Sequence, residues 1–148
     1  MSFLDFTKDI KTLVVQAPTT GSNSTSMASQ TVDTQGFNSC AFVTTVEASS
    51  IMTTQLLQGS TSTTAGDFST LNYNSSTVSL TQGSSAPKGV LITNIHRKPG
   101  AMRYLRLLVE STGARPHGGT VAYLYNGSVR PTTNASTDVL VSTTVVGS

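Results

Sequence analysis

The sequence of 148 residues has no tryptophan, one cysteine and few charged residues, which make up 11% of the chain. The single cysteine, Cys40, excludes an intramolecular disulfide and a multi-cysteine metal site, and its apolar neighbours favour a small buried thiol. Strong helix-forming residues are scarce, so neither a long helix nor a coiled coil is expected. No apolar run approaches the roughly 18 residues that a membrane-spanning helix needs, so we expect no membrane association.

The amino-terminal residues include acids where a secretory signal needs a basic stretch followed by an apolar one. Together with the near absence of cysteine, this feature predicts a protein that is made and assembled in a reducing cytoplasm. The length of the chain corresponds to about one domain.

Serine and threonine dominate what the sequence does contain. The chain has 21 Ser and 25 Thr, so about 31% of its residues carry a small hydroxyl group. Threonine, together with valine, tyrosine and phenylalanine, suits the half-buried surface of a pleated sheet, whereas serine, glycine and asparagine suit turns. The composition therefore favours β strands joined by turns.

Residues 1–35 have the composition of an arm followed by a linker. Residues 11–16 form a short β-prone run, and residues 19–35 are almost wholly small and polar. We expect this linker to be too polar to bury, and to be flexible or ordered only against a partner. The predicted domain boundary therefore lies near Gly36.

Alternating apolar and polar residues over 36–148 predict a single β-sandwich domain. In the segment 103–110, one strand face carries Leu105, Leu107 and Val109, and the other carries Tyr104, Arg106, Leu108 and Glu110. Similar runs separated by turn signals indicate about seven to nine strands. This pattern is typical of an all-β fold, either an antiparallel, jelly-roll-like sandwich or a barrel.

The net charge is only +2, but it is unevenly distributed. Residues 88–130 hold seven of the nine basic residues and one acidic residue, Glu110, which gives this segment a net charge of +6. Such an asymmetry predicts a basic face that meets an acidic partner.

Catalysis requires titratable groups in pairs or triads, and the sequence offers few. His96 and His117 adjoin predicted turns, and neither belongs to a serine-hydrolase or zinc-protease motif; we interpret them as exposed loop histidines. No carboxylate pair shares a predicted strand face, as a glycosidase would need. We therefore expect no enzyme, no cofactor, no metal and no small-molecule substrate.

Three interpretations of the basic segment remain open. Nucleic-acid binding would use aromatic side chains among the arginines, and Tyr104 does lie between Arg103 and Arg106, although no nucleic-acid motif accompanies them. Alternatively, the tyrosines of these strands fill the core and the arginines form ordinary surface pairs. In the third interpretation, the arginines pair with carboxylates of a partner protein.

Residues 89–132 contain an ordered series of motifs. An apolar strand leads to a Lys98-Pro99 turn, a strand with Arg103-Tyr104-Leu105-Arg106 follows, and a later strand ends in Leu124-Tyr125 before Arg130-Pro131. In this order the motifs resemble small virion proteins of tailed bacteriophages, in particular head decoration or cement proteins. The resemblance implies a β-rich, non-catalytic virion protein that binds the outside of the capsid, with the major capsid protein as its partner.

The resemblance also implies where contacts lie. The candidate capsid contacts are Arg97, Lys98, Arg103, Arg106, Arg115 and Arg130. The candidate anchor by which the arm adds to a neighbouring subunit as a strand is Leu13, Val14 and Val15. The expected location is the capsid surface of the virion, after synthesis in the host cytoplasm, and a homo-oligomer (dimer or trimer) is expected.

Two alternatives from other functional classes stay open. One is a receptor- or glycan-binding β-module of a phage fibre or tail, although the lack of tryptophan argues against it. The other is a nucleic-acid-binding protein that uses the basic face of 88–130, although a nucleic-acid partner is not our expectation.

Overall fold

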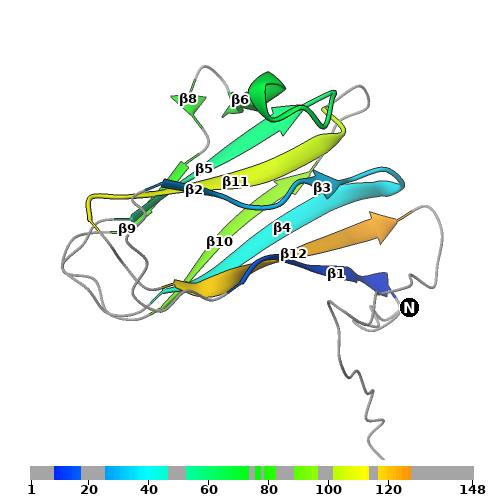
Figure 1. Ribbon diagram of the computed structural model, residues 1–148. Helices are drawn as coiled ribbons and strands as arrows, with labels where there is room; N and C mark the ends of the chain where they lie inside the picture. The colour runs from blue at the N-terminus through cyan, green and yellow to red at the C-terminus, as the bar shows by residue number, and fades with distance from the viewer. Residues whose placement is uncertain are drawn as a thin grey trace, which may run out of the picture.

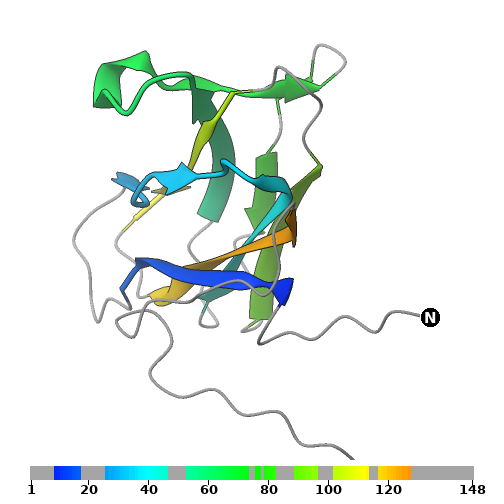
Figure 2. The ribbon, with the colours of Figure 1, turned by 90° about the vertical axis from the view of Figure 1, so that its right-hand side faces the viewer.

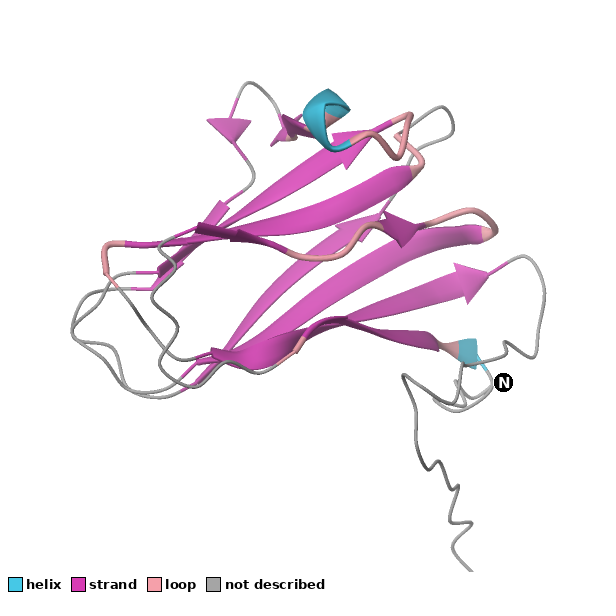
Figure 3. Cartoon of the chain, in the orientation of Figure 1, coloured by secondary structure: helices cyan, strands magenta, loops and turns pink. Residues whose placement is uncertain are grey.

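The computed structural model describes residues 9–17, 26–46, 53–73, 76–77, 79–82, 89–96, 102–113 and 117–127. Over these residues the chain is built almost entirely from β strands (Figure 3). The strands form two antiparallel sheets that stack as two layers (Figure 1), which confirms the predicted all-β sandwich.

The first layer, sheet A, contains four long strands. Their order across the sheet is β1 (Lys11–Gln16), β12 (His117–Gly127), β4 (Phe37–Val46) and β10 (Gly89–His96). Seen from the side in Figure 2, β1 and β12 lie together in the lower part of the molecule.

The second layer, sheet B, is built around β11 (Tyr104–Ser111) and β5 (Thr53–Ser60), which pair along their whole length. Short strands line the outer edges of this pair: β2 (Ser26–Ala28) and β3 (Val32–Asp33) beside β11, and β6 (Ser69–Thr70) and β9 (Ser79–Gln82) beside β5. Among the described residues, sheet A therefore has four strands and sheet B six.

A small extension accompanies sheet B. It comprises the 3-10 helix η1 (Ala65–Asp67) and the two-residue strands β7 (Asn72–Tyr73) and β8 (Ser76–Thr77). Among the described residues, no helix has the length and hydropathy that a membrane crossing requires.

The core lies between the layers and is formed by alternate residues of the long strands. Leu105, Leu107 and Val109 of β11 face inward, as the sequence predicts, and Cys40 is a buried thiol in β4. The buried cluster comprises Val15, Val32, Cys40, Phe42, Leu57, Leu105, Leu107, Val109, Ala122 and Leu124. Removing these side chains from water supplies the main driving force for closing the sandwich.

Part of the interior is polar and consists mainly of threonine. Thr44 on β4 and Thr120 on β12 are directly opposite in register, both 1% exposed, and their hydroxyl oxygens lie 2.7 Å apart. Between the sheets, the hydroxyl of Thr93 donates a hydrogen bond to Oε1 of Gln55 at 3.4 Å. Hydroxyl groups can therefore occupy inward positions where they find a partner.

Residues 9–17 and 26–35 differ from the predicted arm and linker, because β1, β2 and β3 are parts of the two sheets. The rest of the predicted arm and linker, residues 1–8 and 18–25, lies outside the described residues. Val32 is completely buried in the core. The hydroxyl of Ser29, also buried, accepts a hydrogen bond from the amide of Leu107, and the Ser29 amide donates to the Leu107 carbonyl. Polar residues here complete the hydrogen bonds of the β11 edge, so they can be buried at little cost.

Candidate functional site

The structure describes two of the six candidate contact residues, Arg103 and Arg106. Arg97, Lys98, Arg115 and Arg130 lie outside the described residues. Arg106 occupies an outward-facing position in β11, and Arg103 immediately precedes that strand, so both belong to sheet B.

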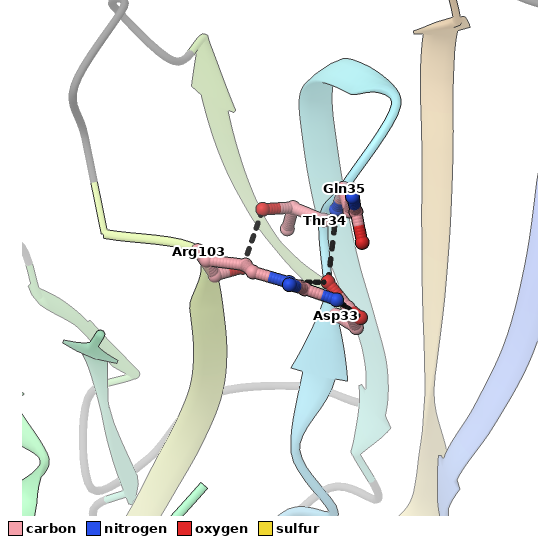
Figure 4. A network of polar contacts seen from close by, with 4 residues as sticks. All are labelled: Asp33, Thr34, Gln35 and Arg103. Carbon is pink, nitrogen blue, oxygen red and sulfur yellow. Dashed lines mark hydrogen bonds and ion pairs between the residues drawn. The ribbon is translucent and has the colours of Figure 1, made fainter. Parts of the chain in front are cut away.

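Arg103 forms a bidentate ion pair with Asp33 of β3, shown in Figure 4. Its Nε donates to Oδ1 at 2.7 Å and its Nη2 donates to Oδ2 at 2.6 Å. Both side chains are 44% exposed, so the pair lies at the surface, where solvent weakens the attraction. Two parallel hydrogen bonds nevertheless fix the plane of the guanidinium.

The backbone around this pair is also tied together. The amide and the hydroxyl of Thr34 both donate to the carbonyl of Arg103, and the amide of Gln35 donates to Oδ1 of Asp33 (Figure 4). The hydrogen bond from Arg103 is the main cause that lowers the pKa of Asp33, and the same contact raises the pKa of Arg103. The two groups therefore remain charged together at neutral pH.

Arg106 is held by a different set of contacts. Its Nε donates to Oε1 of Gln58, the residue directly opposite on β5, at 2.8 Å. Its guanidinium carbon lies 4.3 Å from the centre of the Phe68 ring. A hydrogen bond and a cation–π contact thus hold Arg106 on the outer face of sheet B.

These contacts agree with one part of the interpretation in which the arginines form ordinary surface pairs. The other part, that tyrosines fill the core, is wrong. Tyr104, Tyr123 and Tyr125 are only half-buried, because their strand positions alternate with the inward-facing Leu105, Ala122 and Leu124. The guanidinium carbon of Arg103 lies 5.0 Å from the centre of the Tyr104 ring, so arginine and tyrosine do lie together at the surface.

His96 is the last residue of β10 and lies in a polar cluster on sheet A rather than in the predicted loop. Its Nδ1 lies 2.8 Å from the hydroxyl oxygen of Ser39, which also accepts a hydrogen bond from Asn126. The His96 and Tyr125 rings meet edge to face with centroids 6.1 Å apart. Among the described residues, no group of three or more His, Cys, Asp or Glu side chains could hold a metal ion.

The predicted arm anchor lies in a strand, as expected, and this strand, β1, pairs with β12 of the same chain. Its predicted addition to a neighbouring subunit stays a prediction. Leu13 and Val14 pair in antiparallel register with Ala122 and Val121 of β12. Val15 is 3% exposed and Leu13 packs against the core, whereas Val14 faces solvent.

Sequence reasoning missed Asp33 and Gln58, the side chains that hold the two arginines. Asp33 is 70 residues from Arg103, and no local pattern signals a pairing over that separation. Neither a protein-family model nor a curated protein matches the sequence.

Proposed function

We propose that this protein is a structural virion protein that binds the outer surface of a phage capsid through protein–protein contacts and performs no catalysis. The major capsid protein is its proposed partner, and the virion surface is its proposed location. The observation that carries the proposal is the pair of positioned guanidinium groups, Arg103 and Arg106, on the outer face of sheet B. The order of motifs in residues 89–132, which resembles head decoration proteins, supplies the capsid as the binding surface.

The positions of these arginines favour protein binding on physical grounds. A side chain already held by hydrogen bonds loses less conformational entropy when a partner engages it. A guanidinium has five N–H donors in a planar arrangement that matches carboxylates. The hydrogen bonds described above use two donors of Arg103 and one of Arg106. Both groups can therefore keep their intramolecular partners and also bind an acidic surface.

The test is co-sedimentation of the purified protein with undecorated capsids. We expect Arg106→Gln to lower the occupancy on capsids, and Arg103→Gln to do the same. The matched control is Asn38→Asp, an exposed residue of β4 that lies outside both outer-face sets of residues. It changes the net charge by the same amount as each arginine variant. Unchanged occupancy for both arginine variants would refute the role of this face.

The remaining alternatives give different results in the same preparation. A nucleic-acid-binding protein would retain random DNA in a salt-dependent manner and would not sediment with empty capsids. A fibre or tail module would be found at the tail of intact particles, and its attachment to capsids would not depend on Arg106.

A further inference from the structure

Three large hydrophobic side chains are exposed among the described residues, and all three lie on one surface. They are Val14 on β1, 38% exposed, and Val90 and Ile92 on β10, 53% and 58% exposed. Thr93, the neighbour of Ile92, is buried between the sheets, and so is Val15 beside Val14. The alternation of strand residues therefore turns Val14, Val90 and Ile92 toward the outer face of sheet A, the side away from sheet B.

The registers of sheet A align two of these residues with two more valines. Val14 is opposite Val121, Val121 is opposite Val43, and Val43 is opposite Ile92. One apolar row thus crosses all four strands, from one edge of the sheet to the other. Neighbouring side chains in such a row lie about 5 Å apart and form a continuous apolar surface.

The described part of the outer face of sheet A is also free of acidic and basic residues. The described residues that point to this face are Thr12, Val14, Ser39, Ala41, Val43, Thr45, Val90, Ile92, Asn94, His96, Val121, Tyr123 and Tyr125. None of them is Asp, Glu, Lys or Arg. The outer face of sheet B differs, because Arg106 and Glu110 point outward from β11.

The size of this face meets what a specific dimer needs. Four strands at a spacing of about 4.8 Å, and about 26 Å long, present roughly 500 Å². Two such faces in contact bury roughly 1,000 Å², which is the lower limit for a biological interface. Because the area lies at this lower limit, we expect a weak dimer.

We propose that the outer face of sheet A is a self-association surface, on which a second copy of this chain packs its own sheet A around a two-fold axis. In such an isologous contact both copies use the same patch, so a charged group near the two-fold axis lies close to its own copy. The described residues on the outer face of sheet A carry no Asp, Glu, Lys or Arg that could repel in this way, whereas Arg106 and Glu110 point outward from sheet B. The apolar row gives each copy the same β-branched surface to bury.

The test measures the mass of the purified full-length protein by sedimentation equilibrium over a range of concentrations. Ile92→Thr keeps the β-branched shape but removes apolar surface from both halves of the interface, so we expect the dissociation constant to rise at least tenfold. Leu108→Thr is the matched control, because Leu108 is half-buried on the outer face of sheet B. Circular dichroism and thermal unfolding verify the fold of each variant. If Ile92→Thr does not fold, Val90→Thr takes its place.

Each outcome decides the proposal. A dimer weakened by Ile92→Thr and not by Leu108→Thr supports it. A protein that stays monomeric up to about 1 mM, or a dimer that neither Ile92→Thr nor Val90→Thr weakens, overturns it. A monomer whose Ile92→Thr variant loses capsid binding also overturns it, because the face would then contact the capsid protein. The mass measurement contains no capsid, so its failure does not affect the proposed capsid attachment.

Discussion

The buried pair of Thr44 and Thr120 allows a quantitative test of how this protein accommodates its many hydroxyl groups. Each side chain is 1% exposed, and the oxygens are 2.7 Å apart, an ordinary distance for an O–H···O bond. Replacing one threonine by valine preserves the shape but leaves the other hydroxyl buried without its partner. We expect either single variant to lose about 1–3 kcal/mol of unfolding free energy.

The double variant Thr44→Val/Thr120→Val should behave differently. It removes both polar groups at once and fills the same volume with methyl groups, so we expect its stability to lie within about 1 kcal/mol of the parent protein. Urea unfolding followed by circular dichroism measures all four proteins. A loss of about 2 kcal/mol corresponds to a midpoint shift of roughly 1 M urea at a typical slope for this chain length.

The double-mutant cycle tests whether the hydroxyls of Thr44 and Thr120 are energetically coupled. If the double variant loses the sum of the two single losses, the hydroxyls are not coupled, and each must be satisfied separately. If neither single variant loses stability, the interior near β4 and β12 is not as dry as the exposures of these residues imply.

Two further substitutions test other parts of the structure. The pKa of Asp33 is lowered in the folded protein because Arg103 donates a hydrogen bond to its carboxylate. Asp33 therefore stabilises the fold at pH values above its ordinary pKa, and this stabilisation is lost as pH falls through the lower folded pKa. Asp33→Asn should flatten the acid side of the curve of unfolding free energy against pH, and an unchanged curve would refute this role of Asp33. A Cβ at Gly118 would lie 1.7 Å from Thr45 Oγ1, so Gly118→Ala should destabilise by about 1–3 kcal/mol in urea unfolding, whereas the control Gly66→Ala, with nothing within 4 Å of its Cβ, should change little.

The fold could be predicted where strand residues alternate strictly. In β11 the inward Leu105, Leu107 and Val109 and the outward Arg106 follow from spacing alone, because successive side chains of a strand point to opposite faces. The two-layer arrangement follows because such strands must bury one face against another sheet. Alternation does not define strand order, and the placement of β1 beside β12 had no sequence signal.

In the amino-terminal segment, composition does not predict burial. Ser29 and Thr34 are polar, yet they are 6% and 1% exposed. Their hydroxyl groups bond to backbone atoms of Leu107 and Arg103, which are distant in sequence. A small hydroxyl is costly to bury only when it lacks a partner, and the partner is set by the tertiary fold.

The sequence predicts which residue types form the arginine site but not how they are arranged. Clustering of basic residues and the Arg103-Tyr104 adjacency are visible in the sequence, and both features recur at the surface of sheet B. Whether neighbouring side chains hold an arginine in place depends on the residues opposite it on the adjacent strands. Gln58 and Asp33 come to that position only through the pairing of β11 with β5 and with β3.

The two outer faces of the sandwich carry different chemistry, and salt should separate their roles. Attachment through Arg103 and Arg106 to an acidic surface weakens as ionic strength rises, because the screening length falls to about 8 Å at 0.15 M. Contact through the apolar row that contains Ile92 strengthens in sodium sulfate, which favours burial of apolar surface. Capsid occupancy and dimer mass should therefore change in opposite directions as sulfate is added. If both fall together, charged groups hold the dimer as well, and sheet A is not its interface.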